Sequence, residues 1–120
     1  MRKLLIVDDD EIVTNSIARF FETMGYNARC AYDSDEAMKL IKEDKPDCVL
    51  LDIQLPGTRN GVDVLEEAKN INKNIKVIII TAFVDREIEE QCNKLNTDGY
   101  IIKPLDFQKL LDMVKKITET

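Results

Sequence analysis

Short apolar runs recur along the chain and alternate with longer segments of helical periodicity. The runs are KLLIV (3–7), NARCAY (27–32), DCVLLD (47–52), KVIIIT (76–81) and GYIIK (99–103). Three of them are nearly continuous in apolar character, without alternation of polar and apolar residues, which is typical of strands covered on both faces. The pattern therefore predicts five strands, three of which have the character of strands buried on both faces.

Between these runs, apolar residues recur at spacings of three and four, as they do on one face of a helix. The segments that carry this spacing are 11–24, 37–41, 62–68, 84–95 and 107–117. Gly25 is expected to end the first helix, because glycine adopts positive φ without strain. Ser34 is expected to cap the second helix and Asp106 the last one.

Strands that alternate with helices of this length predict right-handed crossovers and a parallel sheet with helices on both faces. The expected fold is therefore a doubly wound α/β fold of the (βα)₅ type. With 120 residues, 44% of them hydrophobic, and no long polar tract, the chain is expected to form one domain over 1–120.

The helix expected over 84–95 is the most weakly anchored. Its apolar positions form a single seam of Val84, Ile88, Cys92 and Leu95. An element that buries so little has low local stability and is able to shift. The alternative is an ordinary solvated surface helix.

Composition excludes several classes of protein. A net charge of −6 argues against direct nucleic acid binding, which depends on attraction to phosphates. No apolar run reaches the roughly 18 residues of a membrane span, and the apolar stretch at the N-terminus is too short for a secretory signal, so a cytoplasmic location is expected. The absence of histidine excludes Ser-His-Asp and Cys-His nucleophiles and HExxH zinc sites. Cys30, Cys48 and Cys92 lie far apart and are expected to be small buried apolar residues.

Chemistry-bearing residues follow the predicted strands, and ligands of an open parallel sheet bind outside the carboxyl ends of its strands. The residues at these ends are Asp8, Asp9 and Asp10, then Tyr32 and Asp33, Asp52, Thr81 and Ala82, and Lys103 and Pro104. Parallel register brings them to one edge of the sheet. Carboxylates, a hydroxyl and an ammonium group therefore converge from distant parts of the chain.

This group of carboxylates predicts a Mg²⁺ site, because Mg²⁺ takes hard oxygen ligands from a few carboxylates and keeps waters. Asp8, Asp9 and Asp52 are the candidates, with a backbone carbonyl just beyond Asp52. Asp10 is expected to cap the helix over 11–24. The alternative is that all three aspartates of 8–10 serve only as caps.

Asp52 ends a strongly apolar strand, which is expected to hold its carboxylate rigidly. A carboxylate beside a metal ion can act as a nucleophile toward a phosphoryl group. Catalysis of phosphoryl transfer is mostly positioning and charge compensation, for which Lys103 offers an ammonium and Thr81 a hydroxyl.

The segments IVDDD, LLDIQLPG, IIITA and YIIKP together resemble the receiver domain of bacterial two-component response regulators, of which the chemotaxis regulator is the single-domain example. The resemblance covers essentially the whole chain. It implies a flavodoxin-like fold with strand order 2-1-3-4-5. It also implies a phosphoprotein of a two-component or phosphorelay system that uses Mg²⁺ and dephosphorylates itself slowly at most. The implied partners are a histidine kinase or histidine phosphotransfer protein and a downstream protein target.

The resemblance also implies individual roles. Those roles are phosphoacceptor for Asp52, metal ligands for Asp8, Asp9, Asp52 and the backbone carbonyl of Gln54, phosphate contact for Lys103, switch residues for Thr81 and Tyr100, and a Lys103–Pro104 bond that is commonly cis. Two features stand out against the family pattern. The loop PGTRNG has three residues between its glycines instead of two. Phe83 and Gln54 flank the site, at positions that tune the phosphoryl lifetime in the family.

Two rival functions use the same residues. A phosphohydrolase of the haloacid dehalogenase kind also forms an aspartyl phosphate, but it carries a DxD pair after its first strand and usually a cap domain. A binding module that works without phosphorylation is the second. The chain is expected to be either a stand-alone regulator or a receiver from a longer protein.

Overall fold

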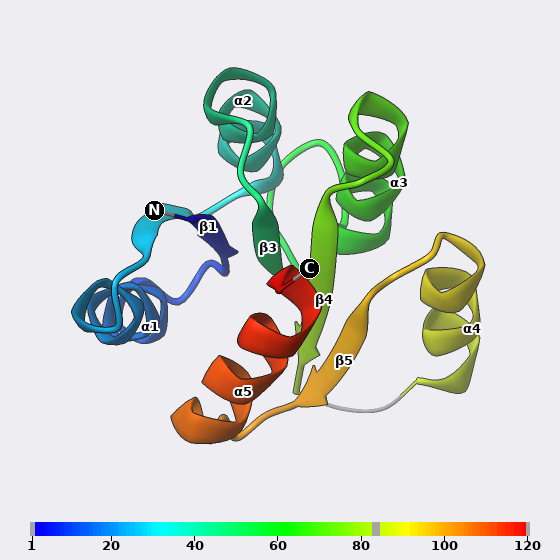
Figure 1. Ribbon diagram of the computed structural model, residues 1–120. Coiled ribbons are helices and arrows are strands. Elements are labelled where there is room, and N and C mark those ends of the chain that lie inside the picture. Colours follow the sequence, from blue (N-terminus) through cyan, green and yellow to red (C-terminus); the bar gives the residue numbers. More distant parts are fainter. Residues whose placement is uncertain (1, 83–84, 120) are drawn as a thin grey trace.

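The computed structural model describes residues 2–82 and 85–119, and within them five strands alternate with five helices (Figure 1). The strands are β1 (Lys3–Val7), β2 (Asn27–Ala31), β3 (Cys48–Asp52), β4 (Lys76–Thr81) and β5 (Gly99–Ile102). The helices are α1 (Glu11–Thr23), α2 (Ser34–Asp44), α3 (Gly61–Ile71), α4 (Arg86–Lys94) and α5 (Phe107–Thr118). The predicted (βα)₅ alternation is therefore confirmed.

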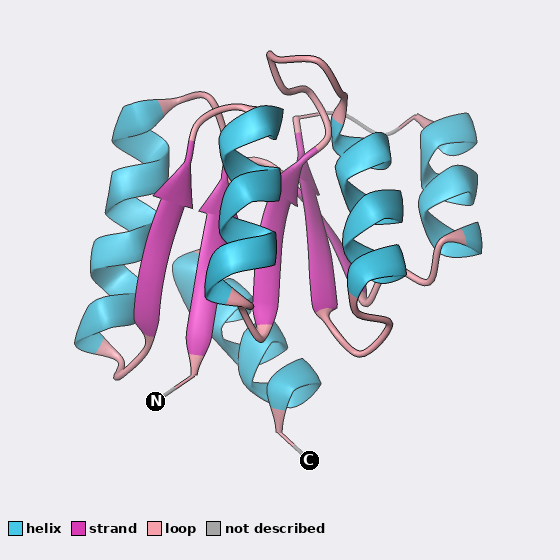
Figure 2. Cartoon of the chain, turned by 90° about the horizontal axis from the view of Figure 1, so that it is seen from above, coloured by secondary structure: helices cyan, strands magenta, loops and turns pink. Residues whose placement is uncertain are grey.

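The five strands form one parallel sheet in the order β2-β1-β3-β4-β5. Figure 2 shows the strand arrows pointing in the same direction. The register pairs Asp52 with Ile80 and Thr81 with Ile102, so the ends of β3, β4 and β5 lie at the same level. The strand order that the resemblance implied is confirmed, and the ends of the strands share one edge.

Helices cover both faces of the sheet (Figure 1). They enclose two apolar layers of buried side chains. One layer lies between the sheet and α2, α3 and α4, and the other lies between the sheet and α1 and α5. All five residues of β3 are buried. The central strand thus gives the site at its end a rigid base, as its apolar sequence predicted.

Several predicted boundaries differ from the structure by one residue. Tyr32, Asp47 and Lys103 lie just outside the strands in which their runs placed them. Helix α1 ends at Thr23 rather than at residue 24, and Gly25 follows with a φ of 92°, as expected for the residue that ends it.

The predicted N-cap of α2 was wrong. Asp33, not Ser34, caps this helix, because its extended backbone lets the carboxylate accept the Glu36 N–H at 2.7 Å. Ser34 is the first helical residue and is fully buried. The caps predicted at Asp10 and Asp106 are confirmed.

Helix α4 is thinly anchored in the part of it that the structure describes. Cys92 is its only buried residue within Arg86–Lys94, with Ile88 partly buried. Val84, the first member of the predicted seam, lies outside the described residues. Cys48 is buried like Cys92, whereas Cys30 is only partly buried, so the expectation for the cysteines holds for two of the three.

Gly61 begins α3 in contact with the end of β3. Its N–H donates to the Ile53 carbonyl at 2.9 Å, and a Cβ at this position would lie 2.5 Å from both the Asp52 carbonyl oxygen and the Ile53 Cα. Both neighbours are backbone atoms, which cannot move aside as a flexible side chain does. The glycine therefore fixes how closely α3 approaches the end of β3.

The substitution Gly61→Ala is expected to lower the free energy of unfolding by about 1–3 kcal/mol, which is the usual cost of overpacking. The measurement is urea denaturation followed by circular dichroism. Gly25→Ala is the matched control, because its Cβ would meet open space and the substitution is strained only through its positive φ, at a cost of roughly 1–2 kcal/mol. A Gly61→Ala variant as stable as the wild type would contradict this account of the α3 contact.

Candidate functional site

The three aspartates that follow β1 do different things. Asp10 is exposed, and its Oδ1 accepts the N–H groups of Ile12 and Val13 at 3.1 and 3.2 Å as the cap of α1. Asp8 is 4% exposed, and its Oδ1 accepts the Asp10 N–H at 3.1 Å. Asp9 is exposed. Of the three side chains, only that of Asp10 caps the helix, which removes the alternative that all three are caps.

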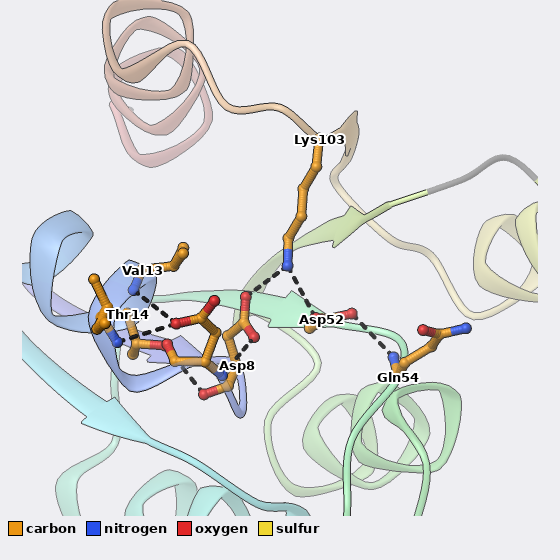
Figure 3. A network of polar contacts seen from close by, with 8 residues as sticks. Asp8, Val13, Thr14, Asp52, Gln54 and Lys103 are labelled. Atoms are coloured by element: carbon orange, nitrogen blue, oxygen red, sulfur yellow. Dashed lines mark hydrogen bonds and ion pairs between the residues drawn. The ribbon is translucent and has the colours of Figure 1, made fainter.

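Asp52 sits at the end of β3 with only 7% of its surface exposed. Its Oδ1 accepts the N–H of Gln54 at 3.0 Å. Its Oδ2 lies 3.2 Å from the Nζ of Lys103 (Figure 3). Both oxygens are thus held by donors, and the carboxylate has a fixed orientation.

Lys103 follows β5 and crosses the edge of the sheet to reach the aspartates. Its backbone N–H donates to the Thr81 carbonyl at 2.7 Å, and its bond to Pro104 is cis, as the resemblance implied. Its Nζ lies 2.8 Å from Asp8 Oδ2 and 3.2 Å from Asp52 Oδ2, bridging the two carboxylates (Figure 3). Burial acts to lower the pKa of Lys103, but the bonds to Asp8 and Asp52 outweigh it and raise the pKa. The ammonium therefore stays charged.

Asp52 has a raised pKa, and the main cause is its burial. The charge of Asp8 acts in the same direction, while the Gln54 N–H and the Lys103 ammonium oppose the rise. The single ammonium is shared between two carboxylates, and burial of Asp52 outweighs its share of that compensation. The site thus has more negative charge than its own cation compensates.

Oxygen atoms of Asp8, Asp9 and Asp52 all lie within 4.8 Å of one another. Such a group of carboxylates, one of them exposed and two buried, has the hard oxygen donors that a divalent cation of the Mg²⁺ or Ca²⁺ type takes. Among the described residues this group can hold a metal ion. A groove of about 500 Å³ opens beside it, with Asp9, Gln54 and Ile88 in its lining.

Thr81 and Tyr100 lie on the same face of the sheet. Thr81 pairs with Ile102, and Tyr100 stands two residues before Ile102, so the alternation of the strands directs both side chains toward the layer that contains α4. Thr81 is buried at the end of β4, and Tyr100 is partly buried against that layer. Burial raises the pKa of the Tyr100 hydroxyl, and the charge of Glu89 on α4 adds to the rise. Tyr100 therefore stands close to α4.

The structure brings together Asp8, Asp9, Asp52 and Lys103, and places Thr81 at the same edge. Gln54 is joined to Asp52 through its N–H, and its side chain is exposed. Phe83, the predicted flanking residue, lies outside the described residues.

Two supporting hydroxyl groups were not predicted from the sequence. Thr14 Oγ1 donates to the Asp8 carbonyl at 3.0 Å, and Ser34 contacts the loop after β3. Neither contact has a signal in the hydrophobic pattern, because both partners lie in loops or first turns.

Comparison with known families supports the resemblance to receiver domains. Residues 4–115 match the family described as the response regulator receiver domain. The chain belongs to this family. It is a phosphoacceptor response regulator of two-component and phosphorelay signal transduction, and such domains interact with histidine kinases or phosphotransfer proteins. The family is one of phosphoacceptor switches.

Solved structures of receiver domains superimpose closely on this chain. The CheY-like receiver domain protein of Methanospirillum hungatei JF-1 is 29% identical with a TM-score of 0.95, covering 98% of this chain and 94% of that one. A LuxR-family DNA-binding response regulator of Staphylococcus aureus is 29% identical with a TM-score of 0.91, covering 99% and 100%. The receiver domain of Francisella response regulator 1452 is 29% identical with a TM-score of 0.88, covering 98% and 97%.

Within residues 2–82 and 85–119, no helix is both long enough and apolar enough to cross a lipid bilayer.

Removal of the buried charge by Asp52→Asn is expected to raise the melting temperature at pH 7 in the absence of divalent cations. The raised pKa means that folding favours protonated Asp52, so the ionised carboxylate lowers stability above that pKa. The gain should shrink as the pH falls through the raised pKa toward the ordinary range of aspartate, because the wild-type side chain then becomes neutral as well. Differential scanning calorimetry in EDTA over pH 4–8 measures both effects.

Glu90→Gln is the control for this experiment, since it removes one negative charge from an exposed position of α4. It is expected to leave the melting temperature nearly unchanged. A lower melting temperature for Asp52→Asn at pH 7 would show that Lys103 stabilises the ionised carboxylate by more than burial destabilises it.

Proposed function

We propose that Asp52 is the residue that accepts the phosphoryl group. Its support is the position of the carboxylate: it is nearly buried, its orientation is fixed by the Gln54 N–H, and its other oxygen faces the only ammonium among the described residues of the site. Asp9 lacks this combination because it is exposed, whereas Asp8 shares it, with one oxygen bonded to the Asp10 N–H and the other 2.8 Å from Lys103 Nζ. Asp52 is proposed over Asp8 because it ends the fully buried central strand β3 and matches the acceptor position of the family pattern.

Asp8, Asp9 and Asp52 hold Mg²⁺ together with the backbone carbonyl of Gln54. The fit rests on the donor set, three carboxylates whose oxygens lie within 4.8 Å and whose charge exceeds that of Lys103. When bound, the ion supplies charge compensation for the oxygens of the transferring group. Asp9 is the exposed member and leaves that side open to solvent.

Transfer is a displacement at phosphorus. An Oδ atom of Asp52 forms the new bond to phosphorus as the bond from phosphorus to the donor nitrogen breaks, and the donor imidazole keeps that electron pair. Lys103 moves from the two carboxylates to an oxygen of the phosphoryl group, which is within its reach because its Nζ already contacts Asp52. Thr81 offers its hydroxyl to the same group from the end of β4.

The donor is a histidine kinase or a histidine phosphotransfer protein. This chain has no histidine, so the phosphoimidazole has to come from a partner. Ile12 is 80% exposed beside an apolar groove that includes Pro104 and Phe107 and borders Lys103, and this groove gives such a partner an apolar contact next to the acceptor. Residues 1–120 are proposed to form one receiver domain, and its place of action is proposed to be the cytoplasm.

Phosphorylation is proposed to act on the Thr81–Tyr100 pair and on α4. Drawing Thr81 toward the phosphoryl group frees space on the face that it shares with Tyr100, and Tyr100 then turns inward. Helix α4, with Cys92 as its only buried residue within Arg86–Lys94, is the element that yields. The differential contacts of the phosphoryl group with Thr81 and Lys103 bias this equilibrium. A downstream protein reads the altered surface.

Asp52→Asn is expected to abolish phosphoryl uptake from acetyl phosphate in the presence of Mg²⁺, because an amide is not a nucleophile toward phosphorus. Intact-protein mass spectrometry measures the added phosphoryl mass. Asp112→Asn, at an exposed aspartate of α5, is the matched control and should be phosphorylated like the wild type. Uptake by Asp52→Asn at the wild-type level would refute the acceptor assignment, and multiple turnover of a small phosphate ester would revive the hydrolase.

Thr81→Ala is expected to keep phosphoryl uptake but to lose most of the response to it. In ¹⁵N–¹H spectra, beryllofluoride with Mg²⁺ should shift the amides of Tyr100 and α4 strongly in the wild type and weakly in the variant, since the missing hydroxyl breaks the coupling. Absence of any metal-dependent shift in the wild type would instead favour a binding module that works without phosphorylation.

A further inference from the structure

The loop between β3 and α3 is held down on the start of α2. It follows Asp52 and Gln54 and contains the three residues between the glycines of PGTRNG, one more than the family pattern. Its backbone meets Ser34 twice: the Pro56 carbonyl accepts the Ser34 N–H at 3.0 Å, and the Arg59 N–H donates to Ser34 Oγ at 3.1 Å. Ser34 is fully buried beneath it.

Gly57 lies directly on the Ser34 side chain. A Cβ on Gly57 would overlap the Ser34 hydroxyl, and its φ of 115° is one that residues with a side chain rarely adopt. The glycine and the serine are thus matched, one leaving the space that the other fills. Asp33 is the N-cap of α2, so the Ser34 hydroxyl is not used for capping and can bond to the loop instead.

Side chains of the loop add a second attachment. Thr58 Oγ1 donates to Asp35 Oδ1 at 2.6 Å, and Arg59 reaches the same oxygen at 3.3 Å. The Nε of Arg59 donates to Glu67 Oε1 at 2.8 Å. Thr58 and Arg59 therefore tie the loop to both α2 and α3, from positions that lie within the longer part of the loop.

The tethered loop begins next to the acceptor. Only Leu55 separates Gln54 from Pro56, whose carbonyl is bonded to Ser34. At the other end, the Gly61 N–H closes the loop onto the Ile53 carbonyl. The peptide units that orient Asp52 and offer the Gln54 carbonyl thus lie between two fixed points, the bond from the Ser34 N–H to the Pro56 carbonyl and the Gly61 contact. The Ser34 hydroxyl holds the next part of the loop through the Arg59 N–H, and this is the bond that a substitution of its side chain removes.

We propose that Ser34 is a positioning residue for the metal site, acting through the loop to fix the Gln54 carbonyl and the Asp52 carboxylate. This inference rests on the proposed function. Thr58, through Asp35, is a weaker contributor to the same positioning. The physical basis is pre-organisation: a carbonyl ligand that is already oriented loses less conformational freedom when the ion binds.

The test is Mg²⁺ binding to Ser34→Ala, measured directly by isothermal titration calorimetry and as the Mg²⁺ dependence of phosphorylation by acetyl phosphate. The half-saturating Mg²⁺ concentration is expected to rise about three- to tenfold, the range to which loss of one neutral hydrogen bond corresponds. The rate at saturating Mg²⁺ should stay within about twofold of the wild type, because the reacting atoms are unchanged. Thr58→Val, at an exposed loop position that does not endanger folding, should shift the half-saturating concentration in the same direction by a smaller factor.

Thr97→Val is the matched control, because it also removes a hydroxyl that bonds to backbone carbonyls, those of Val77 and Gly99. Both carbonyls lie near the starts of β4 and β5, away from the strand ends that carry the site. It should lower the melting temperature without moving the half-saturating Mg²⁺ concentration. This separates positioning of the metal ligands from a general loss of stability.

Each other outcome overturns a specific claim. Wild-type half-saturation in both Ser34→Ala and Thr58→Val, with the wild type phosphorylated normally, rejects the positioning role alone. An equal shift in Thr97→Val also rejects it, since loss of stability would then be the cause. Phosphorylation of the wild type that does not depend on Mg²⁺ rejects both this inference and the proposed metal site.

Discussion

The site depends on one ammonium group shared between two buried carboxylates. Lys103 Nζ bridges Asp8 and Asp52, while Asp9 contributes a third carboxylate nearby. Three carboxylates beside one ammonium leave an excess of negative charge, which a divalent cation can compensate. The bridge is also temporary by its nature, because a lysine is a long flexible chain with a point charge at its end. The same residue can therefore bridge the two carboxylates and, under the proposed function, move to a phosphoryl oxygen on Asp52.

The apolar sheet makes this concentration of charge possible. Strand β3 is buried along its whole length, and its neighbours β1 and β4 are nearly so, which leaves the strand ends little freedom. The helices beside this edge of the sheet differ in how many residues they bury. Helices α2 and α3 bury several residues each, whereas the described part of α4 buries only Cys92. Under the proposed function, a charge added to Asp52 would lie near the firmly packed helices α2 and α3 and the thinly anchored α4, and α4 is the element expected to shift.

Much of this arrangement follows from the sequence because parallel strands obey strong rules. Apolar runs located the strands within a residue, and the rule that strand ends share an edge predicted that Asp52 and Lys103 meet although 51 residues separate them. The wrong cap at Ser34 shows where such rules stop. Asp33 and Ser34 are both good capping residues, and the choice between them depends on the loop from residues 55–60, which hydrophobic periodicity does not place. The hydroxyl of Thr81 could be predicted at the strand ends, but the switch role of Thr81 and Tyr100 required the family resemblance, because a threonine or a tyrosine in a strand has no distinctive pattern.

The longer loop after β3 belongs to the firmly packed side of the site, with α2 and α3, and not to the thinly anchored α4. One additional residue raises the entropy of the free loop only slightly, since loop entropy grows with the logarithm of length. It also supplies the side chains that attach the loop, through Thr58 and Arg59, to Asp35 and Glu67. Under the proposed positioning role of Ser34, the end of β3, this loop and the first turn of α2 form one rigid body. If the metal ligands on that body are fixed before the ion binds, the interaction energy of the phosphoryl group is not consumed in ordering them and remains available to shift Thr81, Tyr100 and α4.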